Sequence, residues 1–202
     1  MLRRAWHALA SKTDHWSRFR LGLTIAVGAA IATGVAIACS AAAVVLTSSE
    51  GFCISCHEMR DTVYAEFKGT IHDKNRTGVR ADCAACHIPH DSVVAMLTTK
   101  TTSGLRDIYG HFISGVIDTK EKFEKERYRL AVGVWTHMKK TDSAECRYCH
   151  NREGMEPDKQ SETARASHAK MKAEGLTCID CHFGIAHNEP DGPGPRELKL
   201  GK

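Results

Sequence analysis

Apart from its first 20 residues, this chain has no net charge, because its basic and acidic residues cancel. Residues 1–20 carry five basic residues and one acidic residue, a net charge of +4, and the whole 202-residue chain is also +4. The chain after residue 20 therefore sums to zero. This distribution argues against a nucleic-acid-binding surface, and it is typical of a targeting and topology signal at the N-terminus.

Charged residues are completely absent from Leu21–Leu46, a run of 26 residues. A helix of that length spans about 39 Å, enough to cross a hydrocarbon core of about 30 Å with some tilt. A cleaved signal peptide has a shorter apolar stretch, of roughly 7–15 residues, and the sequence before Cys39 only faintly resembles a lipoprotein cleavage box. We therefore predict a cytoplasmic segment at residues 1–20 and an uncleaved transmembrane anchor at residues 21–47, with the rest of the chain outside the cytoplasm.

Eight of the nine cysteines lie in four copies of Cys-x-x-Cys-His. The cysteine pairs and their histidines are Cys53, Cys56 and His57; Cys83, Cys86 and His87; Cys146, Cys149 and His150; and Cys178, Cys181 and His182. In this motif two thiols bond the porphyrin of a c-type haem and the histidine binds its iron. No βαβ pattern flanks the motifs, which argues against a thioredoxin-like site, and a zinc ribbon has no need of a histidine after every cysteine pair. The sequence predicts four covalently bound c-type haems.

The haem motifs divide residues 48–187 into two similar halves, at 48–117 and 141–187. The first cysteines of the motifs are 30 residues apart in the first half and 32 in the second. We predict a helix between the halves, over about 118–140, with a capping box at Asp118 and Glu121. Its apolar stripe is expected to pack on the porphyrins and comprises Phe123, Leu130, Ala131, Val134, Trp135 and Met138. The proline-containing tail at 188–202 is expected to be unstructured.

The fold class that follows is mostly α. One N-terminal transmembrane helix precedes a small helical multihaem cytochrome c domain with little β structure. Because four porphyrins fill much of such an interior, few large apolar residues are required there.

The remaining histidines exceed the iron positions open to them. Six lie outside both the motifs and the N-terminal segment, for at most four open positions: His72, His90, His111, His137, His168 and His187. His90 follows His87 by three residues and cannot readily cross its own porphyrin, so any iron that it binds belongs to another haem. Ligation by two histidines closes the iron to small ligands and favours electron transfer.

The chain closely resembles the NapC/NirT family of membrane-anchored tetrahaem quinol dehydrogenases, from the anchor to about Pro190. The matching stretches are residues 53–59, 77–81, 142–147, 177–182 and 184–187. The resemblance implies an inner-membrane protein whose haem domain lies in the periplasm. It would oxidise menaquinol or ubiquinol and pass electrons to a periplasmic reductase or its dihaem cytochrome subunit. Nitrate reductase is the expected acceptor; a nitrite or other reductase, or several acceptors, is the alternative.

The resemblance also implies roles for individual residues at the haem irons. It assigns Met59 as a ligand of the first iron, from the side that His57 would use. It assigns four distal histidines, of which His187 is expected at the second haem, His72 at the third and His168 at the fourth. The fourth of these, His90, is the least certain. Met59, His90 and Asp107 remain contenders at the first haem, whereas His111 and His137 are expected not to bind iron.

Two charged residues after the second motif match the family's quinol site in their spacing. Lys100 would orient the quinol oxygen, and Asp107 would accept a proton or hold a water that does. The alternative is that both are solvated charges on a helix. Two other functions stay open at this point: a terminal reductase of nitrite or hydroxylamine, which would need an open iron and is not expected, and a subunit that only anchors a reductase.

Overall fold

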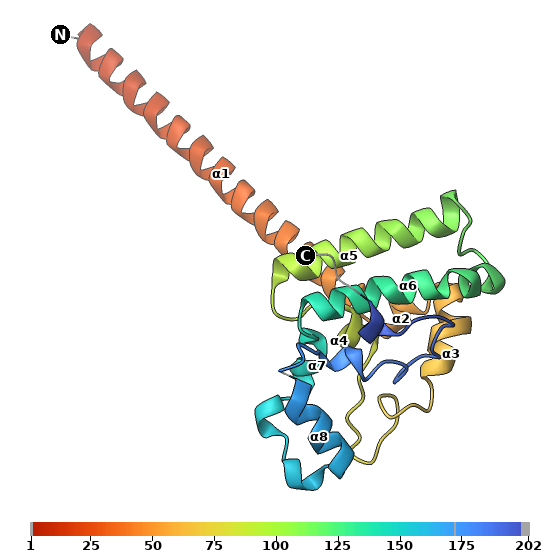
Figure 1. Cartoon of the computed structure of the whole chain (residues 1–202). Coiled ribbons are helices and arrows are strands. Elements are labelled where there is room, and N and C mark those ends of the chain that lie inside the picture. The colour runs from red at the N-terminus through yellow and green to blue at the C-terminus, as the bar shows by residue number, and fades with distance from the viewer. Residues whose placement is uncertain (1, 172, 199–202) are drawn as a thin grey trace. The chain divides into compact units, whose positions relative to one another are not determined.

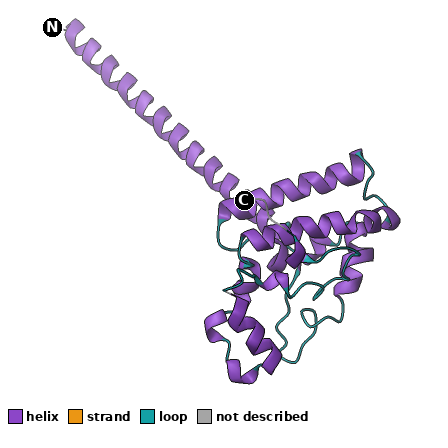
Figure 2. Ribbon diagram, in the orientation of Figure 1, coloured by secondary structure: helices purple, strands orange, loops and turns teal. Residues whose placement is uncertain are grey.

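The structure is a computed structural model that describes residues 2–171 and 173–198, with side chains described from residue 16 onward (Figure 1). All regular structure in these residues is helical, and no strand occurs among them (Figure 2). The prediction of a mostly α fold is therefore confirmed. The chain separates into two compact units, Met1–Thr47 and Ser48–Lys202. We call the described part of the second unit, residues 48–198, the C-terminal domain.

The first unit is a single helix, α1 (Leu2–Leu46). Its segment Trp16–Leu46 has a mean hydropathy of 2.2 and is the one described helix that is long and apolar enough to cross a membrane. The hydroxyls of Thr24 and Ser40 donate to main-chain carbonyls four residues earlier, at 2.9 and 2.8 Å. These bonds satisfy the two hydroxyl groups within the helix, as a lipid environment favours.

The C-terminal domain is built from short helices joined by loops. Its α-helices are α2 (Glu50–Cys53), α3 (Tyr64–Phe67), α4 (Cys83–His87), α5 (Val93–Ile108), α6 (Lys120–Lys140), α7 (Ala144–Cys149) and α8 (Glu162–Met171). Two π-helical segments are η1 (Met59–Val63) and η2 (Tyr109–Ile113). Short 3₁₀ turns are η3 (Arg152–Gly154), η4 (Pro157–Lys159), η5 (Cys178–Asp180) and η6 (Pro195–Glu197). Each haem motif thus overlaps one short helical element: α2, α4, α7 or η5.

The helix between the two halves is α6, and it begins two residues later than predicted. Its N-cap is Thr119, whose hydroxyl accepts from the Lys122 amide at 3.3 Å. Asp118 therefore does not cap the helix, and its carboxylate instead forms an ion pair with the Lys122 ammonium at 2.7 Å. A threonine hydroxyl in extended backbone reaches the first-turn amides as well as an aspartate does, so the two neighbouring candidates were equivalent by residue type.

The apolar core of the C-terminal domain is small. Its buried apolar side chains are Phe67, Ile117, Phe123, Trp135, Met138 and Ile179. Trp135 and Met138 of α6 pack on Ile179, which lies within the fourth motif, and Phe183 packs against the same cluster. The apolar stripe of α6 therefore contacts protein around the fourth motif, and its packing on the porphyrins stays a prediction. So small an apolar core suits a domain whose interior is shared with large apolar cofactors.

The tail is ordered through residue 198, in contrast to the expected unstructured segment. Pro195 is fully buried. The Tyr128 hydroxyl donates to the Pro193 carbonyl at 3.2 Å, and the Lys139 ammonium donates to the Pro195 carbonyl at 2.7 Å. Side chains of α6 thus hold a segment that has little periodicity of its own. Residues 199–202 lie outside the described residues.

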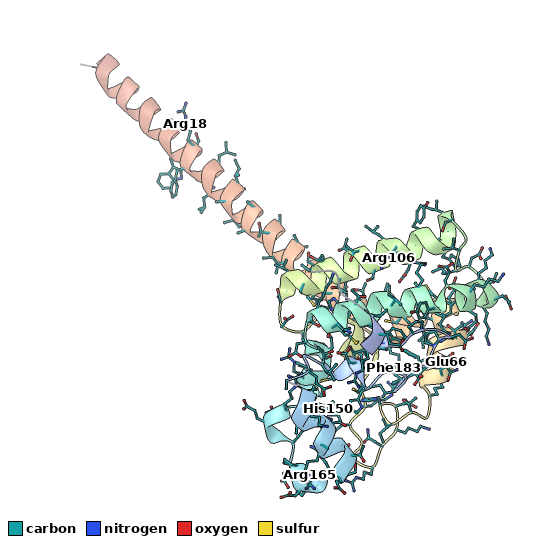
Figure 3. All side chains as sticks on the ribbon, viewed as in Figure 1. Arg18, Glu66, Arg106, His150, Arg165 and Phe183 are labelled. Atoms are coloured by element: carbon teal, nitrogen blue, oxygen red, sulfur yellow. The ribbon has the colours of Figure 1, made fainter. Side chains whose placement is uncertain are left out.

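One cluster of charges ties α6 to the first half and to the C-terminal segment. Arg127 of α6 donates two hydrogen bonds to the Glu66 carboxylate of α3, at 2.9 and 2.6 Å. The same carboxylate accepts from the Asn188 amide at 3.0 Å. Figure 3 labels Glu66 on α3 and Phe183 on the C-terminal segment. Since two planar hydrogen bonds fix the geometry of an Arg–carboxylate pair, this cluster fixes α3, α6 and the segment after His187 relative to one another.

Candidate haem-binding sites

The first and second motifs are neighbours in space. Helices α2 and α4 contact each other, and the Cys83 thiol hydrogen-bonds to Cys53. This bond is the main cause that lowers the pKa of Cys53 to about 7, and it raises the pKa of Cys83. The thiols through which two different porphyrins would attach therefore lie side by side.

The third and fourth motifs repeat this arrangement, and the second and third motifs link the two pairs. A hydrogen bond from Cys146 lowers the pKa of Cys178 to about 5, with help from Arg152. Helices α4 and α7 contact each other. Burial, and then the charge of nearby Cys149, raises the pKa of Cys86. The four motifs thus form a row in the order first, second, third, fourth.

Each motif histidine faces one histidine from elsewhere in the chain. The ring centroids are 5.6 Å apart for His57–His111, 6.2 Å for His87–His187, 6.3 Å for His72–His150 and 6.0 Å for His168–His182. Metal–imidazole bonds are about 2 Å long for zinc, and bonds to iron are of the same order. Two imidazoles on opposite sides of one metal therefore have ring centres roughly 6 Å apart, which matches all four pairs.

Three of the four facing histidines are held through the ring nitrogen that a metal does not need, whereas Nδ1 of the fourth, His72, is buried without a hydrogen-bond partner among the described residues. His187 donates from Nδ1 to the main-chain carbonyl of Val63 at 3.0 Å, and His168 contacts the side-chain amide oxygen Oε1 of Gln160 through Nδ1 at 2.8 Å. His111 contacts the Glu58 carboxylate through Nδ1. Metal-binding histidines usually donate their second nitrogen to an oxygen in this way, which fixes the tautomer and the ring orientation. In all three residues Nε2 is left for a ligand.

Two other histidines use Nε2 for protein contacts. His90 donates from Nε2 to the Ala85 carbonyl at 3.3 Å, and its ring stacks on Tyr148 with centroids 4.4 Å apart. His137 contacts the Glu145 carboxylate through Nε2 at 2.9 Å. Neither ring is paired with a motif histidine. The structure therefore places His90 and His137 apart from the four histidine pairs.

The surroundings of the second pair fit an internal cofactor. Desolvation and the neighbouring His187 lower the pKa of His87 to about 4, although the His87 side chain keeps accessible surface. Together with the cysteine pairs and the small apolar core, the donor set fits four covalently attached haems.

Helix α5 brings Lys100 and Asp107 beside the first motif. The Lys100 ammonium donates to the Ser48 hydroxyl at 2.7 Å. Desolvation lowers the pKa of Lys100, and the nearby Cys53 opposes this shift. Burial raises the pKa of Asp107, Arg106 counteracts it, and the charge of Glu58 adds to it. The two residues are seven positions apart, two helical turns, so they share one face of α5.

The first motif contains a group that the sequence analysis missed. Glu58 is only 4% exposed, and its carboxylate lies against His111. The donor atoms of His57, Glu58 and His111 all lie within 4.8 Å of one another. A carboxylate directly after the motif histidine was visible in the sequence. The position of His111, 54 residues from His57, depends on tertiary structure and left no local signal.

Comparisons with known proteins agree with these sites. The family model described as "NapC/NirT cytochrome c family, N-terminal region" matches residues 15–192. The chain is 49% identical over 150 residues to "Denitrification system component NirT" of Stutzerimonas stutzeri, covering 74% of this chain and 73% of the relative. It is also 49% identical over 144 residues to "Cytochrome c-type protein NapC" of Escherichia coli K12, covering 71% and 70%.

A more distant relative covers more of the chain. "Cytochrome c-type protein TorC" of Escherichia coli K12 is 40% identical over 191 residues, covering 94% of this chain and 47% of the relative. No solved structure is significantly similar to the chain. The equal identity to NirT and NapC does not distinguish between these two branches. The long match to the family model and the high coverage of both relatives nevertheless settle the broader classification: the chain belongs to the NapC/NirT cytochrome c family of electron-transfer proteins.

Proposed function

We propose that this protein is a membrane-anchored tetrahaem cytochrome that oxidises quinol and passes the electrons to a periplasmic reductase. The observation that carries the proposal is the placement of Lys100 and Asp107 beside the first motif. Cys53 follows the end of α1 at Leu46 by only seven positions. By the positive-inside rule, the basic segment at 1–20 stays in the cytoplasm and the C-terminal domain lies in the periplasm.

The exposed surface of α5 suits a site at the membrane. Its exposed apolar side chains are Val93, Val94, Leu97, Leu105 and Ile108. Exposed apolar patches on otherwise polar domains mark contact sites for lipid, ligand or protein. Ser48, two residues beyond α1 in the sequence, accepts a hydrogen bond from Lys100, so α5 is held at the first residue of the C-terminal domain. A quinol headgroup would meet α5 from the bilayer.

When bound, the four haems supply a series of one-electron carriers. The second, third and fourth histidine pairs support the proposed ligands, which are His187 with His87, His72 with His150 and His168 with His182. Cysteine contacts support the same order of attachment sites, from first to fourth. Since every motif histidine has a facing histidine, an open iron for nitrite or hydroxylamine is not part of the proposal.

Lys100 and Asp107 divide the quinol chemistry between them. Oxidation of one quinol to quinone releases two electrons and two protons. Asp107, whose raised pKa reflects burial, accepts a proton directly or through water. The partly desolvated Lys100 ammonium orients the quinol oxygen and stabilises the negative charge that forms as the proton leaves.

The fourth haem is the proposed exit. Its facing histidine, His168, lies in α8, at the end of the C-terminal domain opposite α5 and α6 (Figure 1). Electrons received beside α5 would therefore leave at the far end of the row. The proposed acceptor is a nitrate reductase or its dihaem cytochrome subunit. A nitrite reductase or another periplasmic reductase is the alternative within the same family.

The function is tested on the full chain, purified and reconstituted in liposomes. Menaquinol and ubiquinol analogues are added separately, and haem reduction is followed at the α-band. We expect at least one of them to reduce all four haems, and an oxidised periplasmic reductase to reoxidise them. Carbon monoxide added to the dithionite-reduced protein should leave the spectrum unchanged. A protein that dithionite reduces but no quinol analogue reduces would refute quinol oxidation, and strong carbon monoxide binding would favour a terminal reductase.

A further inference from the structure

We propose that His57 and His111 are the two axial ligands of the first haem, and that Glu58 positions His111 for this role. The inference deepens the proposed function, because it defines the haem that receives electrons from quinol. It rests on haem attachment and does not depend on quinol oxidation. It also gives the first haem a ligand that the family resemblance did not assign.

The first pair is similar to the other three in the separation of its rings. Its ring centroids are 5.6 Å apart, against 6.0 to 6.3 Å for the others. The two rings are inclined by 72°, close to the 84° of the His72–His150 pair, whereas the rings of the other two pairs are inclined by 32° and 43°. A motif histidine and a facing histidine thus recur at all four motifs, and the first is no exception.

Glu58 supplies the oxygen that a ligating histidine needs at its second nitrogen. The His111 Nδ1–H group donates to the Glu58 carboxylate, which leaves Nε2 for the iron. Glu58 is 4% exposed, and its main-chain carbonyl accepts a hydrogen bond from the Thr62 hydroxyl. A buried carboxylate is costly unless it is paired. His111 provides that partner, so the two groups stabilise each other.

The backbone around both residues is unusual in the same way. His111 is the central residue of the π-helical segment η2, and Glu58 immediately precedes the π-helical segment η1. Single π-helical turns are rare and occur frequently at functional sites, because the extra residue redirects the following side chains. Gly110 is buried, and a Cβ there would lie 3.1 Å from Ile117. Close packing on Ile117 thus fixes the segment that carries His111.

The other contenders for the first iron fit less well. His90 engages Ala85 through Nε2 and stacks on Tyr148. Met59 follows His57 by two residues, so it would replace His57 and would not face it. Glu58 itself lies within reach of His57, at 3.6 Å from Nε2. Its carboxylate is already paired with His111, and ligation by Glu58 is therefore the competing outcome of the test.

Two imidazoles on the first iron restrict how quinol can react. With both axial positions filled, no quinol oxygen binds the metal. The two electrons would then have to leave the quinol one at a time without a bond to iron, while its two protons would go to Asp107 or water. Lys100 and Asp107 of α5, and not the iron, would therefore orient the substrate.

The ligand set is tested by counting low-spin haems in the purified full chain, with electron paramagnetic resonance and near-infrared magnetic circular dichroism. The variants are His111→Ala and, as a matched histidine control, His90→Ala. We expect four low-spin haems in the wild type and in His90→Ala, and three low-spin and one high-spin haem in His111→Ala. Intact mass must show four attached haems in each. Added imidazole should return the high-spin haem of His111→Ala to the low-spin state.

The variant His111→Met separates ligation from folding if His111→Ala fails to accumulate. We expect it to stay low-spin and to show the near-infrared band of histidine–methionine ligation at one haem. Four bis-histidine haems in either His111 variant, or loss of one in His90→Ala, would overturn the assignment. A carboxylate-type high-spin signal in the wild type that disappears in Glu58→Ala would assign the position to Glu58.

The positioning role of Glu58 has its own readout. In Glu58→Gln the amide oxygen can still accept from His111, so we expect four low-spin haems with a shifted reduction potential at one. In Glu58→Ala that acceptor is lost, and we expect a mixture of high- and low-spin first haem. Wild-type spectra and potentials in Glu58→Ala would refute the positioning role. The spin states and masses are measured on the purified protein and the potentials by dithionite titration, so a protein that fails to oxidise quinol still tests the ligand assignment.

Discussion

The two inner histidine pairs differ from the two outer pairs in where their partners come from. The inner pairs are His87–His187 and His72–His150, and the outer pairs are His57–His111 and His168–His182. Each inner pair joins a residue of the half 48–117 to one of the half 141–187, whereas each outer pair closes within one half. The duplicated motifs of the sequence therefore do not form two independent modules. Under the proposed ligation, the halves share their central cofactors.

The inner and outer sites also differ in what surrounds them. The carbonyl of Val63 that holds His187 lies three residues before Glu66, the partner of Arg127. The inner sites are thus tied to α6 by a mostly buried ion pair. The first outer site is instead flanked by α5, with Lys100 and Asp107. The inner sites thus join the two halves, whereas under the proposed function the first outer site would meet the substrate.

The largest expected effect comes from removing an inner ligand. In His72→Ala or His187→Ala, we expect the yield of tetrahaem protein to fall roughly 10-fold or more. Losing even a hydrogen-bond partner of a metal ligand costs about 10–100-fold in metal affinity, and here the ligand itself is lost together with a link between the two halves. In the outer variant His168→Ala, we expect a near-normal yield with one high-spin haem. Haem-stained gels and intact mass give both quantities. Equal yields from inner and outer variants would remove the distinction.

The ion pair behind the inner sites is the next test. Arg127 and Glu66 are 11% and 15% exposed, so Arg127→Met leaves a largely buried carboxylate unpaired. We expect it to lower the free energy of unfolding by about 2 kcal/mol, somewhat below the cost of breaking a fully buried pair. Urea unfolding of the oxidised protein, followed at the Soret band, measures it.

Arg129 provides the matched control on the same helix. It pairs with Glu126 at a position where the arginine is 59% exposed. Arg129→Met should change the free energy of unfolding by no more than about 0.5 kcal/mol, as is usual for surface ion pairs. If both arginine variants lose the same stability, Arg127 has no special part in joining the halves.

Quinol oxidation should depend on the residues beside the first outer site. We expect Lys100→Gln and Asp107→Asn each to slow quinol oxidation roughly 10-fold, the scale for losing one acid–base or electrostatic group. Lys125→Gln, an exposed lysine of α6, serves as control and should keep the wild-type rate. The measurement is steady-state haem reduction by a quinol analogue in liposomes, with haem content and dithionite reduction unchanged. Wild-type rates in both α5 variants would exclude Lys100 and Asp107 from the quinol site.

The smallest effect concerns pH. Burial raises the pKa of Asp107 above the ordinary value of about 3.9 for an aspartate. As the pH rises through this raised pKa, the carboxylate loses its proton and becomes able to accept one from quinol, so the rate should rise by a few-fold on the acid side. Lys100→Gln should keep this acid limb at a lower overall rate. Asp107→Asn should lose it, and an acid limb that persists in Asp107→Asn would assign the proton acceptor elsewhere.

The sequence predicted features that depend on local spacing. The helical fold follows from apolar periodicity and from the long uncharged run that became α1. The family follows from four local motifs and the residues around them. The distal histidines His72, His168 and His187 came from a resemblance, and they stay predictions, although each faces a motif histidine in the structure.

Other features depend on contacts between distant residues and left no local signal. His111 reaches the first motif only because η2 turns it toward Glu58. The tail is ordered because Tyr128 and Lys139, more than fifty residues earlier, bind its carbonyls. Prolines and glycines indicate an irregular backbone, but they do not distinguish a mobile segment from one that is held in place. The start of α6 was misplaced for a smaller reason, since Asp118 and Thr119 are both good N-cap residues.

The His87–His187 pair also has a consequence for how the protein is made. The two residues are separated by 100 positions, so at synthesis rates of about 5–20 residues per second the second histidine emerges roughly 5–20 s after the first. Under the proposed ligation, the second motif would lack its facing histidine during that interval. The site would be completed only when His187 reaches the Val63 carbonyl. The last of the proposed ligands to be synthesised would thus complete a site near the beginning of the domain.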